Sequence, residues 1–208
     1  MFKNKSEVSK PLVPFLLIGV LNGYMNGATI FIIKSILTLP LFLRKCPRNF
    51  PKEFLKSAGF MVHLYIGLQK RMDKEKAFEL IRASVLPTAL ATMQANFRFV
   101  EEDRNFENLI KYQKLTSNIG ITKLNTIKIV EENESNYHFK VTRCLFYEFF
   151  NMLGVAELTS IMCAVDNAVF NCYLPNEIIF ERKYGETIAE GNDFCSFCIK
   201  KVNVTDNL

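Results

Sequence analysis

The sequence predicts an α+β fold in which N-terminal helices are followed by an antiparallel sheet with two short helices between its strands. Two observations predict this order. Between Pro51 and Tyr112 apolar residues recur at the three- and four-residue spacing of amphipathic helices. From Thr122 onwards several short stretches alternate apolar and polar residues, as half-buried strands do. The two short helices are expected over 145–153 and 155–173.

The composition favours a single packed domain and apolar packing over nucleic-acid binding. The chain has 208 residues, of which 49% are hydrophobic and 23% charged, so it is long enough to bury a sizeable core. It contains 19 Phe and no Trp, which predicts a core or ligand pocket rich in phenylalanine. The net charge of +5 comes from dispersed Lys and Arg, so we expect no nucleic-acid partner and only a mild attraction to acidic membrane surfaces.

The cysteines are predicted to be free thiols. Six are present, enough for three disulfides, but a chain of this size and hydrophobicity needs no such cross-links. Free thiols indicate a reducing compartment, so we expect a cytoplasmic protein. The cysteines are Cys46, Cys144, Cys163, Cys172, Cys195 and Cys198.

The N-terminal segment is the most apolar part of the chain. Residues 11–33 carry no charge and are long enough to be a transmembrane candidate. Polar residues such as Asn22 and Asn26 interrupt them, and a second apolar run, 35–43, follows at once. We therefore expect a helical hairpin that is buried or docked on a surface, with a membrane span and a cleaved signal peptide as the alternatives.

Two regions follow from this pattern. Residues 1–45 form an apolar helical segment, for which contact with a membrane surface through residues 11–43 is an alternative to burial. Residues 46–208 form the α+β domain.

The helices of this domain have recognisable ends. The first is expected to begin at Pro51, which suits a first helical turn, and to run to about Met72. Asp73 can cap the next helix, which we expect Pro87 to end. Another helix is predicted over 88–97.

A charge run at Glu101 to Arg104 is expected to be a solvated turn. Asp103 is predicted to cap the helix that follows it.

The sheet is predicted from four alternating stretches. Residues 124–130 and 137–142, joined by a polar turn, read as a β-hairpin that ends at Arg143 and Cys144. A strand over 177–183 places Phe180 and Arg182 on one face. In the last strand, 194–202, Cys195 and Phe197 point to one face of the sheet and Cys198 to the other, so Cys195 and Cys198 are a poor chelating pair.

Thiols and carboxylates recur together on the two short helices. Cys144 and Glu148 are four residues apart, so they share a helix flank. If that flank is buried, Glu148 raises the pKa of the thiol unless a cation, Arg143 or Arg182, intervenes; the alternative is a solvated Glu148 beside a small core cysteine. Cys163 and Asp166 are three residues apart, displaced from the core stripe, a spacing that suits a nucleophile with a base or two metal ligands. Cys172 is expected on the core stripe.

Taken together, these motifs resemble the L-2-amino-thiazoline-4-carboxylic acid hydrolase family. The resemblance covers roughly the last 90 residues well. It lies in Thr142-Arg143-Cys144, Leu153-Gly154-Val155-Ala156-Glu157-Leu158, Cys163-x-x-Asp166, Phe180-Glu181-Arg182 and Thr187-Ile188-Ala189-Glu190-Gly191-Asn192-Asp193-x-Cys195-x-Phe197. The fold is also similar to 4-vinyl reductase-type domains, which implies a small-molecule cavity.

The resemblance implies a bacterial hydrolase of cysteine metabolism that opens a C–N bond of a thiazoline ring. Such a reaction needs a nucleophile or activated water, a proton donor and a cation for the substrate carboxylate. Our hypothesis assigns Cys144 or Cys163 as nucleophile, Asp166 as base or orienting group and Glu148 as alternate acid. Substrate binding is assigned to Arg182 as carboxylate clamp, together with Cys195, Asn167, Phe170 and Phe197.

Three alternatives remain open at this point. We expect no cofactor, but Cys144, Cys163, Cys195 and Asp166 could instead converge on zinc or iron. The chain could be a ligand-binding module without catalysis, with a Phe-lined cavity. It could also be a membrane-associated accessory protein, a reading that depends on residues 11–43 alone.

Overall fold

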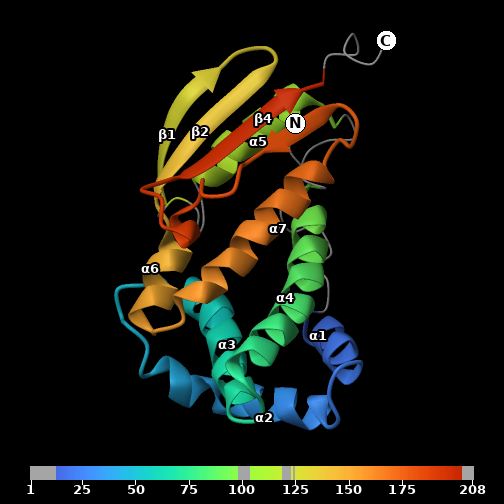
Figure 1. Ribbon diagram of the computed structural model, residues 1–208, viewed down its shortest axis with the longest axis vertical. Helices are drawn as coiled ribbons and strands as arrows, with labels where there is room; N and C mark the ends of the chain where they lie inside the picture. Colours follow the sequence, from blue (N-terminus) through green and yellow to red (C-terminus); the bar gives the residue numbers. More distant parts are fainter. Residues whose placement is uncertain (1–12, 98–103, 119–122, 124, 203–208) are drawn as a thin grey trace.

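The computed structural model describes residues 13–97, 104–118, 123 and 125–202. A four-stranded antiparallel sheet forms the upper half of the molecule in Figure 1, and helices form the lower half. The helices are α1 (Val13–Asn22), α2 (Ala28–Leu43), α3 (Lys52–Gln69), α4 (Lys74–Phe97), α5 (Phe106–Ser117), α6 (Leu145–Met152) and α7 (Thr159–Asn171). The strands are β1 (Thr126–Glu132), β2 (Asn136–Arg143), β3 (Ile178–Glu181) and β4 (Cys195–Lys201). The predicted α+β fold is confirmed.

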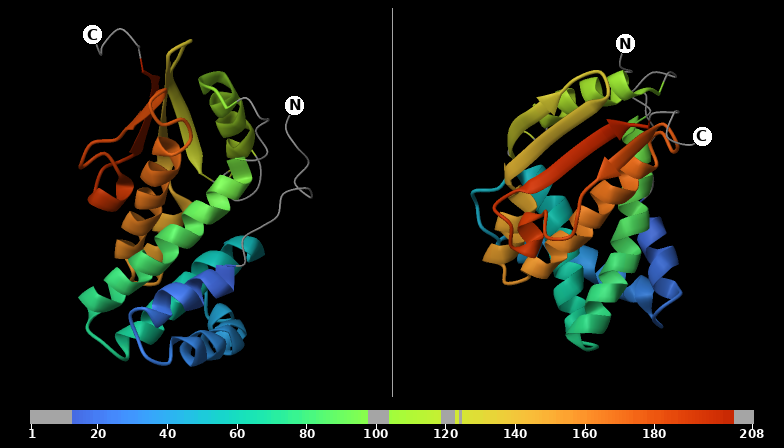
Figure 2. Two further views of the ribbon diagram at one scale, coloured as in Figure 1. Left: turned by 90° about the vertical axis from the view of Figure 1, so that its right-hand side faces the viewer. Right: turned by 45° about the horizontal axis from the view of Figure 1, so that its top comes forward.

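The sheet has the strand order β1-β2-β4-β3, and every neighbouring pair is antiparallel. On β3 the even-numbered Ile178 and Phe180 face inward. On β2 and β4 the odd-numbered residues do so, with Val141, Phe139 and Tyr137 of β2 opposite Cys195, Phe197 and Ile199 of β4. All six side chains are buried. Helices α5 and α7 cover this one face, behind the strands in the right-hand view of Figure 2. The predicted strand parity is confirmed.

The N-terminal segment forms the expected helical hairpin. Helices α1 and α2 are joined by a turn in which Gly27 has φ 74°, a left-handed conformation that glycine adopts at low cost. Leu17, Leu21, Phe31 and Ile32 are buried in the same core as α3 and α6. In the parts of the chain that the structure describes, no helix is both long and apolar enough to cross a membrane.

Pro87 does not end a helix, and this expectation was wrong. Helix α4 continues from Lys74 to Phe97 with Pro87 inside it. The hydroxyl of Thr88 donates to the carbonyl oxygens of Ser84 (3.1 Å) and Val85 (2.9 Å), next to the position where the proline lacks an N–H. Contacts of α4 with α7, α1 and α3 also hold the helix on both sides of the proline. Tertiary packing therefore overrides the local signal.

The caps of two helices can be compared with expectation. Asp73 caps α4 as predicted, because its Oδ1 accepts the N–H of Lys76 at 2.8 Å. Asp103 lies outside the described residues, and the side chain that caps α5 is that of Asn105, which accepts the N–H of Asn108 at 2.8 Å. Helix α6 ends as predicted before Gly154, which has φ 71°.

Two hydrophobic clusters form the core. One is made by α1, α2, α3, the first half of α4 and α6. The other lies between the sheet, α5 and the second half of α7. Helix α7 contributes Ile161 to the first cluster and Val165 to the second, so its middle turn lies where the two meet. This turn carries Cys163 and Asp166.

Candidate active site

The thiols of Cys163 and Cys195 form the centre of the site. Cys163 projects from α7, and Cys195 is the first residue of β4, facing inward by the strand register. The two thiols are close enough for an S–H···S interaction, which is the largest influence on the acidity of either. The Sγ atom of Cys195 also accepts the backbone N–H of Ile188, at 3.3 Å, from the short 3₁₀ helix η4 (Ile188–Glu190).

These contacts separate the acidities of the two thiols. Donation from Cys163 lowers the pKa of Cys195 to about 7, with further help from the Ile188 N–H and the Arg182 charge, against the effect of burial. The same hydrogen bond, together with burial and the nearby Asp166, raises the pKa of Cys163 well above its ordinary value. The pair therefore favours a thiolate on Cys195 and a proton on Cys163.

Arg182 lies buried against aromatic rings, with 3% of its side chain exposed. Its guanidinium is 4.5 Å from the ring centre of Phe197 and 5.1 Å from that of Phe180. Nη2 donates to Asn167 Oδ1 at 2.9 Å, and to Asp166 Oδ2 and the Cys163 carbonyl at 3.4 Å each. Nε and Nη1 are buried and bond to no described residue. An arginine in this state provides unused donors for a negative charge.

Asp166 lies next to Arg182 on α7. Its pKa is raised to about 6, because burial disfavours the carboxylate more than the Arg182 charge and hydrogen bond favour it. Its side chain nevertheless remains 40% exposed. Asp166 can therefore change its protonation state within the pH range where enzymes work.

Cys144 connects this cluster with the surface. It precedes α6 and lines a hollow of about 340 Å³. Burial raises the pKa of its thiol to about 11, and Cys195 and Asp166 lie near enough for their charges to raise it further. The hollow is lined by Thr142, Arg143, Cys144, Tyr147, Glu148, Ile188, Gly191, Asn192 and Asp193.

Glu148 does not lie against the Cys144 thiol as a buried carboxylate. Its two oxygens accept from Arg143 Nε at 2.6 Å and from Nη2 at 2.9 Å, a bidentate pair at the rim of the hollow. Of the cations offered by the sequence, Arg143 is the one that pairs with Glu148. Burial, and not Glu148, is the main cause of the raised Cys144 pKa.

The residues predicted to bind the substrate have different roles in the structure. Phe170 and Phe197 pack edge to face, with ring centres 6.2 Å apart, and Phe180 lies between Phe170 (4.9 Å) and Phe197 (5.7 Å). Asn167 holds Arg182. Sequence reasoning did not single out Phe180 or Ile188 as site residues. Both were in the quoted motifs, and the parity that puts Phe180 beside Arg182 could have identified it.

Two other cysteines lie away from the cluster. Cys172 was expected in the core, which was wrong: it ends α7, after the last helical turn that packs inward, and is exposed. Cys198 lies on the opposite face of β4, as parity predicted, and contacts Asn136 Oδ1 at 3.5 Å.

The thiols do not form a recognisable metal site. Within the described ranges no three His, Cys, Asp or Glu side chains are grouped closely enough to hold a metal ion. The acidities of Cys144, Cys195 and Asp166 differ, with pKa values of about 11, 7 and 6, and the pKa of Cys163 is raised.

Comparison with known proteins places this cluster in a family. No curated protein and no solved structure matches the chain significantly. The model of the L-2-amino-thiazoline-4-carboxylic acid hydrolase family matches residues 53–199, well over half of the chain. The match includes Cys144, Cys163, Asp166, Arg182 and Cys195, and the family name denotes a hydrolase. The chain belongs to the L-2-amino-thiazoline-4-carboxylic acid hydrolase family.

Proposed function

We propose that the chain is a hydrolase that opens the ring of L-2-amino-thiazoline-4-carboxylate or a closely related cyclic amidine. One observation carries the proposal: Cys144 lines a surface hollow and lies near enough to Cys195, whose pKa is lowered to about 7, for the charge of that thiolate to act on it. The family match supports the reaction class.

In this proposal Cys144 is the nucleophile, since it is the cysteine that lines the hollow. Its Sγ attacks the ring carbon between nitrogen and sulfur, and its proton passes to the Cys195 thiolate. Because the pKa of Cys144 lies above that of Cys195, this transfer is uphill and has to accompany the attack. Asp166, whose pKa is raised to about 6, raises the pKa values of Cys163 and Cys195 when it is ionised.

Ring opening then follows from the adduct. The tetrahedral carbon expels one of its two ring atoms, which takes a proton. The group left on Cys144 Sγ is a dithioimidate if nitrogen leaves and an isothiourea if sulfur leaves. Water adds to that carbon and Cys144 leaves as the thiol, so the product equals the substrate plus one water. Expulsion of nitrogen, the expected C–N cleavage, gives S-carbamoylcysteine; expulsion of sulfur gives N-carbamoylcysteine.

The carboxylate of the substrate needs a cation. Arg182 was expected to bind it, and its free Nε and Nη1 donors suit that role, but its side chain is 3% exposed. Arg143 lines the hollow itself with 53% of its side chain exposed. We assign the carboxylate to Arg143, in competition with Glu148, and the stabilisation of the Cys195 thiolate to Arg182.

The test is incubation with L-2-amino-thiazoline-4-carboxylate, followed by mass spectrometry for a carbamoylcysteine. A free-thiol assay identifies the broken bond, because only C–S cleavage releases a thiol. Cys144→Ser should lose at least about a hundredfold in rate, whereas Cys172→Ser, at an exposed and distant position, should keep full activity. A Cys144→Ser variant as active as the unmodified protein would remove Cys144 from the mechanism.

Binding without catalysis is the second candidate, and the burial of Cys195, which is 5% exposed, favours it. A ligand in the hollow would then be held but not attacked. A rise in melting temperature with the thiazoline carboxylate, without any carbamoylcysteine, is the result that supports this candidate.

A further inference from the structure

Helix α2 presents an apolar face to solvent. Ile30 and Leu37 are each 73% exposed, Leu41 59% and Ile33 50%. These positions recur at helical spacing on one side of α2, while Phe31, Ile32 and other residues of the opposite side are buried. A surface helix normally turns polar residues outward. The exposed aliphatic face of α2 is therefore suited to contact with another apolar surface.

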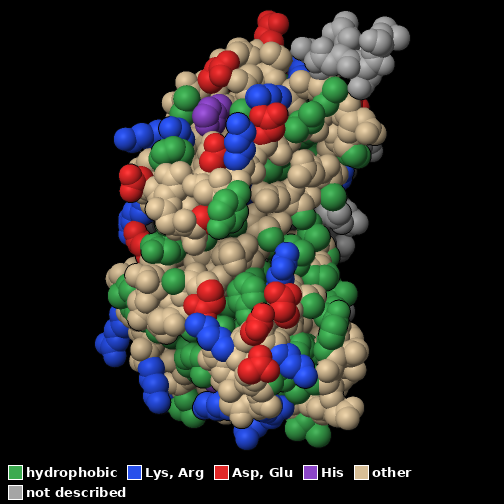
Figure 3. Space-filling view, viewed as in Figure 1, with side chains coloured by type: hydrophobic (Ala, Val, Ile, Leu, Met, Phe, Trp, Pro, Cys, Tyr) green, Lys and Arg blue, Asp and Glu red, His purple; other side chains and the backbone are tan. Residues whose placement is uncertain are grey.

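The segment of the sequence that contains α2 is basic. Between Glu7 and Glu53 the sequence contains basic residues and no acidic one. In Figure 3, Lys and Arg side chains lie beside hydrophobic ones along the lower edge, where Figure 1 places α2. The basic residues are Lys10, Lys34, Arg44, Lys45, Arg48 and Lys52.

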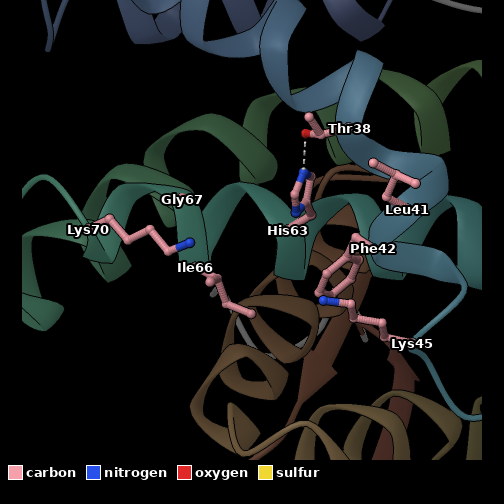
Figure 4. A pocket seen from close by; sticks show the side chains of 8 residues that line it. All are labelled: Thr38, Leu41, Phe42, Lys45, His63, Ile66, Gly67 and Lys70. Carbon is pink, nitrogen blue, oxygen red and sulfur yellow. Dashed lines mark hydrogen bonds between the residues drawn. The ribbon is translucent and has the colours of Figure 1, made fainter.

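A hollow of about 260 Å³ lies between α2 and α3, next to the exposed face. Its walls are mainly apolar, including Leu41, Phe42 and Ile66, and Lys45 and Lys70 approach it from two sides (Figure 4). His63 Nε2 is hydrogen-bonded to Thr38 Oγ1 at 2.8 Å and stacks on Phe42. An apolar hollow with two amines suits a phosphate carried on an acyl chain.

We propose that the α2 face docks on a membrane surface that contains anionic phospholipid, with its aliphatic side chains at the boundary of headgroups and acyl chains and a headgroup phosphate near Lys45 and Lys70. Charge complementarity selects this occupant, because two copies of the chain joined through α2 would bring like charges together. The hollow beside this face shares no lining residue with the hollow that Cys144 lines, so the two sites are distinct.

The experiment is sedimentation of the full chain with vesicles of phosphatidylcholine, with and without phosphatidylglycerol. We expect binding only to the vesicles that contain phosphatidylglycerol, and weaker binding at high salt. Ile30→Gln with Leu37→Gln should weaken binding at least about tenfold. Lys45→Gln with Lys70→Gln should weaken it by about fivefold per lysine. Leu115→Gln, at a 43% exposed leucine of α5, is the matched control and should bind like the unmodified chain.

The outcomes separate the possible occupants. Since the substituted side chains are exposed, each variant should keep its melting temperature, which circular dichroism checks. Failure of the unmodified chain to bind anionic vesicles overturns the proposal, and so does equal binding by the Ile30 and Leu37 double variant. A dimer in sedimentation that this double variant dissociates, without vesicle binding, assigns the face to a second copy instead.

Discussion

The thiols of Cys163 and Cys195 differ in acidity. The pKa of Cys195 is lowered to about 7 while that of Cys163 is raised, because the interaction between the two thiols and the N–H of Ile188 both favour a thiolate on Cys195. Asp166 and Arg182 act on this pair with opposite signs. Their removal should therefore move its titration in opposite directions.

Asp166→Asn should lower the pKa of Cys195. The carboxylate, ionised above its pKa of about 6, raises the pKa of the neighbouring thiol by charge repulsion. Without it, thiolate absorbance in the ultraviolet should appear at lower pH, with Cys195→Ser as the blank. Glu177→Gln, at an exposed residue, is the control that should leave the titration unchanged. A shift to higher pH would contradict this account of the pair.

Arg182→Met should raise the pKa of Cys195, because the nearby guanidinium charge stabilises the thiolate. The rising limb of kcat/KM against pH should then move to higher pH while KM at high pH stays within about threefold. If Arg182 instead binds the substrate carboxylate, as its sequence position suggested, KM rises by at least about tenfold and the limb stays in place. Lys200→Met, which removes an exposed partner of Glu181, is the control.

Sequence reasoning reached some of these residues and missed others for physical reasons. Strand parity depends on the backbone alone, so it correctly directed Cys195 inward and Cys198 outward. The pairing of Arg143 with Glu148 and the contact of Cys163 with Cys195 depend on side chains brought together by the fold. Cys172 was misplaced because the helical stripe was continued past Asn171, where α7 ends; beyond that point Tyr173, and not Cys172, is the buried side chain.

At the scale of elements, local signals hold where no packing opposes them. The Asp73 cap and the turn at Gly154 follow from backbone chemistry and were predicted. Pro87 is the exception, since α4 passes through it with α7, α1 and α3 packed along its length.

Pro87→Ala should stabilise the protein. The substitution restores an N–H that can donate to the Ala83 carbonyl and removes the proline ring, while the exposed position loses no core contact. We expect the free energy of unfolding to rise by roughly 1 to 3 kcal/mol. Denaturant unfolding measures this, with exposed Arg82→Ala as a control that changes stability by less than about 0.5 kcal/mol. Lower stability would mean that the proline sets an angle that the packing needs.

Gly67 allows α2 and α3 to approach closely. A Cβ atom at this position would lie 2.9 Å from Cε2 of Phe31 on α2, nearer than two carbon atoms can approach. Gly67→Ala should therefore destabilise the protein by about 1 to 3 kcal/mol in denaturant unfolding. Gly19→Ala in α1, where nothing lies within 4 Å, should stabilise it by about 0.5 to 1 kcal/mol. Equal effects at both glycines would show that helix propensity, and not the contact with Phe31, determines the result.

At the scale of the whole molecule, the order of elements was predictable because hydrophobic period distinguishes helices from strands. The association of elements distant in sequence was not predictable from period. The hairpin α1–α2 shares its core with α6, and α7 joins both hydrophobic clusters at the turn that carries Cys163. The active-site cluster therefore depends on the relative position of the two halves.

The predicted boundary at residue 45 leads to a test of this interdependence. Deletion of residues 1–45 removes Leu17, Leu21, Phe31 and Ile32, four large side chains buried in the helical core. At about 1.5 to 3 kcal/mol each, their loss is comparable with the total stability of roughly 5 to 15 kcal/mol of a typical domain. We expect the chain 46–208 to lose its cooperative thermal transition and to aggregate.

The full chain with Ile30→Gln and Leu37→Gln, which changes only the exposed face of α2, is the control and should melt at the temperature of the unmodified protein. If 46–208 instead melts sharply at the temperature of the full chain, residues 1–45 are an independent region, as the apolar composition alone predicted.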